Sequence, residues 1–196
     1  MEIKPTQITW DQIPEGWLVQ PKYDGECNKL IWKDGKASLQ RFEGRSKTLF
    51  YPEIIEYAEK LNLPDMVLVG EVCILMNELV ASFPHIQLRM NTQNKAKQKL
   101  AMKDKLATFV AFDIEEYSDK NLDKKPYKQR YKLLENILPS ILNIRANSSG
   151  DVYRIVAVAN LKPQKDWKAF VKKHEMEGIV VKNPERAAEQ VKLKNW

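Results

Sequence analysis

Hydrophobic positions along the chain fall into short segments rich in β-branched and aromatic residues, several with the alternation of a half-buried strand. These segments predict strands at residues 17–21, 28–32, 37–42, 66–75, 108–114, 152–159, 178–182 and 190–193. Between the second and third, the sequence Lys-Asp-Gly-Lys at residues 33–36 is typical of a tight hairpin turn. The second and third strands are therefore expected to pair antiparallel.

Longer segments carry hydrophobic residues at helical spacing and predict helices at residues 52–61, 94–105, 126–138 and 163–174. Three of them begin with proline, which a helix tolerates best in its first turn. Residues 147–150, Asn-Ser-Ser-Gly, have the composition of a flexible segment, and so short a stretch favours a loop over a domain boundary. We therefore expect one domain over residues 1–196, of the α+β class, with antiparallel β-sheets flanked by helices.

Composition narrows the class of protein further. The 196 residues are 43% hydrophobic, which supports one well-buried core. A formal net charge of +6, spread along the chain, is compatible with a polyanionic partner. Cys27 and Cys73 match neither a zinc-binding pattern nor a disulfide framework, which favours a reducing compartment. No leader peptide or membrane-spanning stretch is recognisable, so we expect a cytoplasmic protein without membrane contact.

Four short motifs follow one another along the chain: KYDG at residues 22–25, VGE at 69–71, EGIVVK at 177–182 and VKLK at 191–194. Lys22 follows a short apolar strand and precedes a turn-forming Asp-Gly pair, so its side chain is expected at a strand end. A lysine attacks phosphorus as the neutral amine, and its ordinary pKa of about 10.4 means that desolvation or nearby cations must favour that form. Lys192 and Lys194 are candidates for those cations. Alone, the first motif is typical of a surface hairpin turn; the ordered set indicates a nucleophile.

This ordered set resembles the adenylation domain of the ATP-dependent DNA ligases, which are covalent nucleotidyltransferases with an ATP-grasp-like fold. The resemblance begins at about Gln20 and runs to the last residue. It implies that Lys22 takes AMP from ATP as a phosphoramidate and passes it to the 5′-phosphate of a nick, after which the 3′-hydroxyl displaces AMP. The implied cofactors are ATP and Mg²⁺ or Mn²⁺, and Mg²⁺ suits carboxylate and phosphate oxygens best.

The resemblance also implies roles for the residues around Lys22. Phe112 falls where an aromatic ring stacks on adenine, and Glu71 and Glu177 fall where carboxylates hold the ribose and the metal ion. The implied nucleotide-binding residues are Gln20, Tyr23, Arg41, Glu71, Phe112, Lys182, Lys192 and Lys194, and the three lysines are those expected at the α-phosphate. The structural alternatives are a Glu71 paired with an arginine and a Phe112 that only fills the core.

Two positions depart from the family pattern. Gln20 stands where an acidic residue usually contacts the adenine amino group, and a glutamine carbonyl can still accept that hydrogen bond. Cys27 stands where the pattern K-x-D-G-x-R places an arginine near the ribose and the nick. Asn28 and Lys29 are the candidates to replace that arginine.

Three arginines are implied to contact nucleic acid. Arg41 and Arg45 belong to a segment similar to the motif that meets the 5′-phosphate side of a nick, and Arg89 ends a segment similar to F-x-x-[LI]-Q-x-R. The predicted helix 94–105 bears Lys95, Lys97, Lys99, Lys103 and Lys105, which either follow a duplex backbone or are simply solvated. His85 and His174 are interpreted as structural or surface residues.

In this family an oligonucleotide-binding (OB) β-barrel follows the fourth motif, and we expect this chain to lack one. It is then either an adenylation domain cut from a longer ligase or a minimal protein that works without the barrel or with one from a partner. The expected partners are nicked double-stranded DNA and a separate OB-fold or clamp-type protein, and the chain is expected to be a monomer.

Two other functions stay open: an RNA ligase or RNA-repair enzyme, and a catalytically silent nucleotide- or nucleic-acid-binding module. A NAD-dependent ligase fits less well, because the zinc-binding cysteines of that class are absent. A capping enzyme also fits less well, since that class usually has an aspartate where Glu177 stands.

Overall fold

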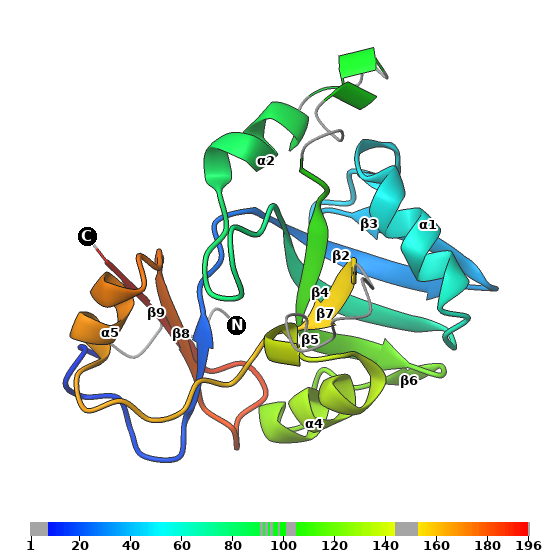
Figure 1. The fold of residues 1–196 in the computed structure, drawn as a ribbon. Coiled ribbons are helices and arrows are strands. Elements are labelled where there is room, and N and C mark those ends of the chain that lie inside the picture. The colour runs from blue at the N-terminus through cyan, green and yellow to red at the C-terminus, as the bar shows by residue number, and fades with distance from the viewer. Residues whose placement is uncertain are drawn as a thin grey trace.

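The computed structural model describes residues 8–90, 92, 94, 96, 97, 99, 100, 105–143 and 153–195. Within this part of the chain the strands form two sheets, with helices packed against them (Figure 1). The predicted α+β class and its antiparallel sheets are confirmed, with one exception, since β5 and β7 pair parallel.

The larger sheet has the strand order β3-β2-β4-β5-β6, with β7 paired to β5. Its strands are β2 (Glu26–Lys33), β3 (Lys36–Gln40), β4 (Met66–Cys73), β5 (Thr108–Tyr117), β6 (Lys120–Asn121) and β7 (Ile155–Ala157). The predicted hairpin joins β2 to β3, and Lys33 pairs with Lys36 across the turn. Asp34 and Gly35 both have positive φ, 51° and 73°, as a two-residue hairpin loop requires.

The smaller sheet joins the two ends of the described chain. It has the order β1-β8-β9, from β1 (Leu18–Pro21), β8 (Gly178–Lys182) and β9 (Gln190–Lys194), and both pairings are antiparallel. The motif EGIVVK thus supplies β8, whose predicted bounds are confirmed. Because β1 leads directly into β2, the chain crosses from the smaller sheet to the larger one at residues 22–25.

The described part of the chain includes the helices α1 (Pro52–Lys60), α2 (Phe83–Met90), α4 (Tyr127–Ile137) and α5 (Trp167–Lys173), with short 3₁₀ turns at Thr48–Phe50 and Ile141–Asn143. Helix α5 begins later than predicted, because the Asp166 side chain accepts a hydrogen bond from the Ala169 amide at 2.8 Å and so caps the helix there. Helix α2 was not predicted. The predicted helix 94–105 lies partly outside the described residues, Lys95 and Lys103 included.

Each sheet has its own hydrophobic core. In the larger core, Trp32 of β2 is 2% exposed and donates a hydrogen bond to the Ala58 carbonyl of α1 at 3.1 Å. In the smaller one, Trp167 and Val171 of α5 pack with Ile179 of β8. Figure 1 shows α5 beside the smaller sheet, α1 and α4 against the larger one, and α2 near the top of the view, where Ile86 joins the larger core. No helix in the described segments has both the length and the apolar character needed to span a lipid bilayer.

Candidate active site

A pocket with an empty volume of about 540 Å³ lies where the two sheets meet. Both sheets contribute to its walls, which are formed by Gln20, Pro21, Lys22, Tyr23, Cys27, Glu71, Phe112, Val158, Val180, Lys182, Gln190 and Lys192. The structure therefore brings together residues from all four sequence motifs.

Lys22 lies at the crossing between the sheets and is fixed there by its own backbone. Its amide donates a hydrogen bond to the Gly178 carbonyl at 3.0 Å. Its Nζ lies 2.5 and 2.6 Å from the two carboxylate oxygens of Glu177, and the two side chains are only 17% and 10% exposed. Gly25 lets this turn approach β4, because a Cβ at that position would stand 2.4 Å from the Val72 carbonyl oxygen.

Glu71 faces the same pocket from β4, opposite Cys27 on β2. Burial raises the pKa of Glu71 to about 8, partly offset by the positive charges of Lys22 and Lys192, while the Glu177 carboxylate raises it further. Two carboxylates that repel each other beside a pocket form a donor set that suits a divalent cation. Mg²⁺ commonly takes one or two carboxylates and completes its coordination with phosphate oxygens and water.

Among the described residues, no three or more His, Cys, Asp or Glu side chains lie close enough together to hold a metal ion by themselves. A divalent cation at Glu71 and Glu177 would therefore depend on a bound phosphate for its remaining ligands. The residues fit Mg²⁺ as an ion that arrives with a nucleotide, and they do not resemble a closed structural metal site.

Part of the pocket wall is apolar. Phe112 on β5 and Val180 on β8 both line it and belong to different sheets. A planar ring such as a nucleobase fits between an aromatic face and a branched aliphatic side chain. Phe112 is partly buried: it packs against the larger core and also lines the pocket.

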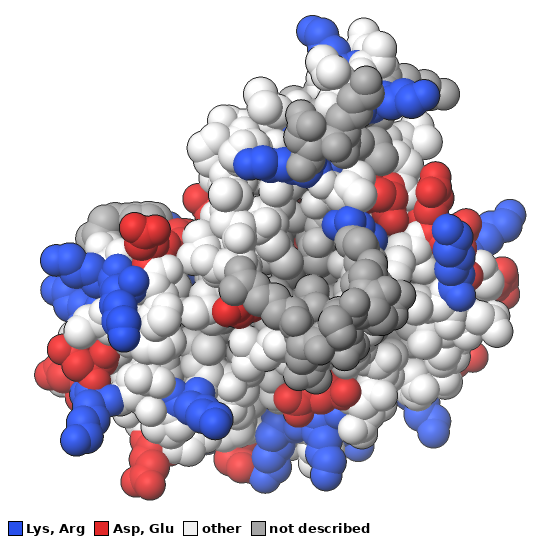
Figure 2. Space-filling model, viewed as in Figure 1, with Lys and Arg blue, Asp and Glu red and all other residues white. Residues whose placement is uncertain are grey.

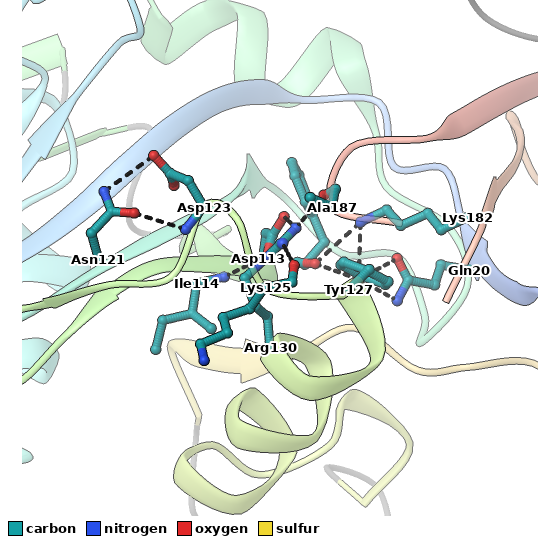
Figure 3. A network of polar contacts seen from close by, with 11 residues as sticks. Gln20, Asp113, Ile114, Asn121, Asp123, Lys125, Tyr127, Arg130, Lys182 and Ala187 are labelled. Atoms are coloured by element: carbon teal, nitrogen blue, oxygen red, sulfur yellow. Dashed lines mark hydrogen bonds and ion pairs between the residues drawn. The ribbon is translucent and has the colours of Figure 1, made fainter. Parts of the chain in front are cut away.

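Lys182 lines the pocket from β8 and is held there by Phe112 and Tyr127. Its Nζ donates hydrogen bonds to the Phe112 carbonyl at 3.1 Å and to the Tyr127 hydroxyl at 2.9 Å, and it lies 4.1 Å from the centre of the Tyr127 ring (Figure 3). Burial lowers the pKa of Lys182 to about 7. These contacts hold Lys182 beside Phe112 and Tyr127, and its contact with the α-phosphate stays a prediction.

Tyr127 is the functional candidate that the sequence did not reveal. It opens α4 and bonds to Gln20, Phe112 and Lys182 together. Its position in an amphipathic segment gave no sign of this, because core tyrosines are common at such positions. The next turn of α4 is fastened to β5, since Arg130 pairs with Asp113 at 2.7 and 2.9 Å (Figure 3).

Lys192 and Lys194 alternate along β9 with the buried residues Val191 and Leu193. This alternation turns both lysines away from the smaller core, and Lys192 lines the pocket. Lys194 lies 3.8 Å from Glu177, which makes it a second cation beside the carboxylate that holds Lys22.

Tyr23 and Cys27 line the pocket without contributing charge. The Tyr23 hydroxyl donates to the Glu78 carbonyl at 2.6 Å, which anchors the motif. Burial raises the pKa of the Cys27 thiol to about 12, so it stays neutral at physiological pH. Neither proposed replacement for the missing arginine lines the pocket, because Asn28 is fully buried and Lys29 pairs with Glu115 at 2.5 Å.

Arg41 and Arg45 lie on the segment after β3, outside the residues that line the pocket. Arg41 is 37% exposed and pairs with Glu43 at 2.9 Å, and its guanidinium lies 3.6 Å from the buried Glu26. Arg45 is exposed. Both positions are open to a large ligand.

The structure contradicts the expectation that Arg89 contacts nucleic acid. Its side chain is fully buried and pairs with Glu53, including one contact of 2.9 Å, and it also donates to the Phe50 carbonyl at 2.8 Å. This arginine therefore joins α2 to α1. A guanidinium committed in this way is not available to a phosphate backbone.

The surface charges give only partial support for contact with DNA. Of the lysines predicted on the helix 94–105, Lys105 bonds to His85 at 2.9 Å, and that imidazole also contacts Ser82 at 2.6 Å. His174 stacks against Phe170. On the face shown in Figure 2, basic and acidic side chains are interspersed around the edge and form no continuous basic patch.

Comparisons with known proteins agree with this geometry. A family model described as the ATP dependent DNA ligase domain matches residues 3–196. DNA ligase C2 of Mycolicibacterium smegmatis is 29% identical over 129 residues, which cover 65% of this chain and 36% of that protein. The bifunctional non-homologous end joining protein LigD of Bacillus subtilis is 26% identical over 213 residues, covering 99% of this chain and 34% of that protein. The chain thus spans about a third of the length of these relatives.

Solved structures show the same likeness. A mycobacterial DNA ligase D complexed with ATP and MES matches with a TM-score of 0.72 and 26% identity, covering 98% of this chain and 59% of that one. The bacteriophage T7 ligase in complex with ATP shares the fold, with a TM-score of 0.55 and 15% identity over 92% of this chain and 62% of that one. Because the family model covers nearly every residue, the chain belongs to the family of ATP-dependent DNA ligase domains.

Proposed function

We propose that the chain is the adenylation domain of an ATP-dependent DNA ligase, in which Lys22 becomes covalently attached to AMP. The observation that carries this proposal is the placement of Lys22. Its Nζ lies 2.5 Å from Glu177, beside a pocket that is also lined by Glu71, Lys192 and the ring of Phe112. A nucleophile, carboxylates for a cation, positive charges for phosphate and a slot for a base occur together.

In the first step the neutral Lys22 amine forms a bond to the α-phosphorus of ATP. The bond between that phosphorus and the bridging oxygen breaks, and pyrophosphate leaves with the electron pair. The nitrogen gives up one proton, and the Glu177 carboxylate is positioned to accept it. Lys192 and Lys194 offset negative charge on the phosphate oxygens.

Mg²⁺ or Mn²⁺, held by Glu71 and Glu177 with phosphate oxygens, would offset the charge on the leaving pyrophosphate. The protein's own contribution is to hold Lys22 in line with the phosphate while Phe112 and Val180 fix the base. Gln20 at the end of β1 supplies a hydrogen-bonding group at the edge of that base. Tyr23 holds the nucleophile's turn against the core.

In the later steps AMP passes from Lys22 to the 5′-phosphate of nicked double-stranded DNA, and the 3′-hydroxyl then displaces AMP. Arg41 and Arg45 are exposed enough to meet the DNA backbone beside the nick. We propose that the domain acts as a monomer and that a separate OB-fold or clamp-type protein strengthens its grip on DNA.

The first test is covalent labelling with α-labelled ATP and Mg²⁺, followed by denaturing electrophoresis and peptide mass analysis. Wild-type protein is expected to gain one AMP on Lys22, and Lys22→Ala is expected to gain none. Lys33→Ala is the matched control, because Lys33 is 63% exposed on the hairpin turn and far from the carboxylates of the pocket. Labelling that persists in Lys22→Ala would refute the assignment of the nucleophile.

The second test uses matched nicked duplexes with DNA or RNA on each side of the break. Sealing of the all-DNA nick, weakened by salt as phosphate contacts are screened, is the expected result. Preferential sealing of RNA ends would favour the RNA-repair alternative. Nucleotide binding with neither labelling nor sealing would favour the silent binding module.

A further inference from the structure

Gln20 and Tyr127 form a buried pair at the base-binding end of the pocket. Gln20 is 1% exposed on β1, and Tyr127 is 3% exposed on α4. The Gln20 amide nitrogen lies 2.9 Å from the Tyr127 hydroxyl oxygen, and the amide oxygen lies 3.3 Å from it (Figure 3). This pair links the strand that leads to Lys22 with a helix that no sequence motif includes.

The Tyr127 hydroxyl has one hydrogen, and the surrounding groups determine where it goes. The Phe112 carbonyl oxygen is 2.6 Å away and can only accept, so it takes that hydrogen. Lys182 lies 2.9 Å from the same hydroxyl and has hydrogens to give in either protonation state. The hydroxyl oxygen therefore accepts from Lys182 and has one lone pair left for Gln20.

This hydrogen count fixes the orientation of the Gln20 amide. Only the amide nitrogen can donate to the remaining lone pair of Tyr127, whereas the amide oxygen would face an oxygen with no hydrogen to spare. The nitrogen is thus committed to Tyr127. The carbonyl oxygen receives no other hydrogen bond from the described residues and is the group left for a ligand in the pocket that Gln20 lines.

We propose that Tyr127 is a positioning residue for nucleobase selection: its hydroxyl holds the Gln20 amide so that the carbonyl oxygen, and not the nitrogen, meets the base. A carbonyl oxygen matches a purine that carries an amino group at C6, as adenine does. It opposes a purine with an oxo group there, as guanine has, because two acceptors would face each other. This inference rests on the proposed function, which places the base between Phe112 and Val180.

Removal of the hydroxyl releases this orientation. In Tyr127→Phe the Gln20 nitrogen loses its acceptor, and Lys182, which reached the same oxygen at 2.9 Å, becomes a donor that favours the opposite amide orientation. The ring itself is expected to stay, because it stacks on Tyr131 with centroids 5.9 Å apart. The Phe112 carbonyl keeps its hydrogen bond from Lys182 at 3.1 Å.

The experiment measures the ratio of dissociation constants for GTP and ATP, by competition against a fluorescent ATP analogue, together with the labelling rates for both nucleotides. Wild-type protein is expected to prefer ATP, and Tyr127→Phe is expected to lower that preference by about tenfold or more. Tyr131→Phe is the matched control, since it loses a buried hydroxyl of the same helix that donates to the Val158 carbonyl at 2.9 Å and lies outside the residues that line the pocket. Its preference is expected to equal that of the wild type.

Introducing Tyr127→Phe into a Gln20→Glu variant distinguishes a loss of amide orientation from a general disturbance of the pocket. In Gln20→Glu both terminal atoms of the side chain are oxygens, so the Tyr127 hydroxyl can no longer determine which kind of atom faces the base. Adding Tyr127→Phe to Gln20→Glu is therefore expected to change the nucleotide preference by less than about threefold. Unchanged urea unfolding midpoints would show that all four variants are folded.

The outcomes distinguish this inference from the proposed function. Covalent labelling of the wild type by ATP tests the proposed function alone, whereas the binding ratios test the role of Tyr127 even when no adduct forms. An unchanged ratio in Tyr127→Phe, or an equal loss of preference in the Gln20→Glu background, would overturn the inference. A chain that binds neither nucleotide would overturn both.

Discussion

The buried Lys182 predicts an unusual dependence of stability on pH. This side chain is 5% exposed, and burial lowers its pKa from 10.5 to about 7, although the negative charge of Asp113 acts in the opposite direction. Lys182→Met removes the titrating group and keeps an unbranched apolar side chain in its place. The Tyr127 hydroxyl still accepts from Gln20 and donates to Phe112 in this variant, so no buried polar group is left alone.

Whether the free energy of unfolding rises or falls with pH depends on how many protons the folded and unfolded chains bind. Below pH 7 the folded and unfolded chains both carry the proton on Lys182, and above pH 10.5 neither does. Between these values the unfolded chain binds more protons, so the free energy of unfolding rises with pH, by about 1.4 kcal/mol per pH unit. From pH 7 to pH 9.5 the wild type should gain about 3 kcal/mol relative to Lys182→Met.

Urea unfolding followed by tryptophan fluorescence, at half-unit steps from pH 7 to pH 9.5, measures this difference directly. Glu71, whose pKa is near 8, titrates in both proteins and cancels in the comparison. Lys33→Met on the exposed turn is the matched control and should show no pH-dependent difference. A constant difference between wild type and Lys182→Met across this range would show that Lys182 keeps its ordinary pKa and would refute the reasoning.

Two further substitutions test the packing around the site. Glu53→Gln leaves the buried Arg89 guanidinium without its counter-charge. The free energy of unfolding, measured by urea titration, should fall by about 3 to 5 kcal/mol, while the folded fraction keeps its AMP labelling. A loss below about 1 kcal/mol would contradict the buried pair. Gly178→Ala brings a Cβ to within 2.1 Å of the Leu193 carbonyl and should separate β8 from β9, so that AMP labelling falls by about tenfold or more. Normal labelling by Gly178→Ala would show that Lys192 and Lys194 need no precise register with β8.

Local signals in the sequence were sufficient for much of the fold. The Asp34-Gly35 turn and the flanking alternation led directly to the β2–β3 hairpin. The apolar run after Glu177 gave the bounds of β8, because its residues are mostly buried. Helix α2 was missed because residues 82–89 were interpreted as a motif, although Pro84 in the first turn is a usual helix signal.

The sequence indicated site residues whose chemistry depends on their own type. It did not indicate side-chain positions that are set by residues far away in the sequence. The four motifs led to Lys22, Glu71 and Lys192, which line one pocket, and to Glu177, which pairs with Lys22 beside it. Arg89 and Lys182 differ, because their positions depend on Glu53 of α1 and on Tyr127 of α4, which no motif connects to them. Those pairings arise only when the helices pack on the larger sheet.

The closure of the smaller sheet by strands from both ends of the described chain has a consequence for biosynthesis. Lys22 and Glu177 are 155 residues apart, so at about 5 to 20 residues per second the nucleophile leaves the ribosome about 8 to 30 seconds before its carboxylate partner. During that interval β1 has neither β8 nor β9 to pair with. Since contacts of such long range also form slowly, the ability to react with a nucleotide is acquired only after β8 and β9 have been made, when most of the larger sheet has had time to fold.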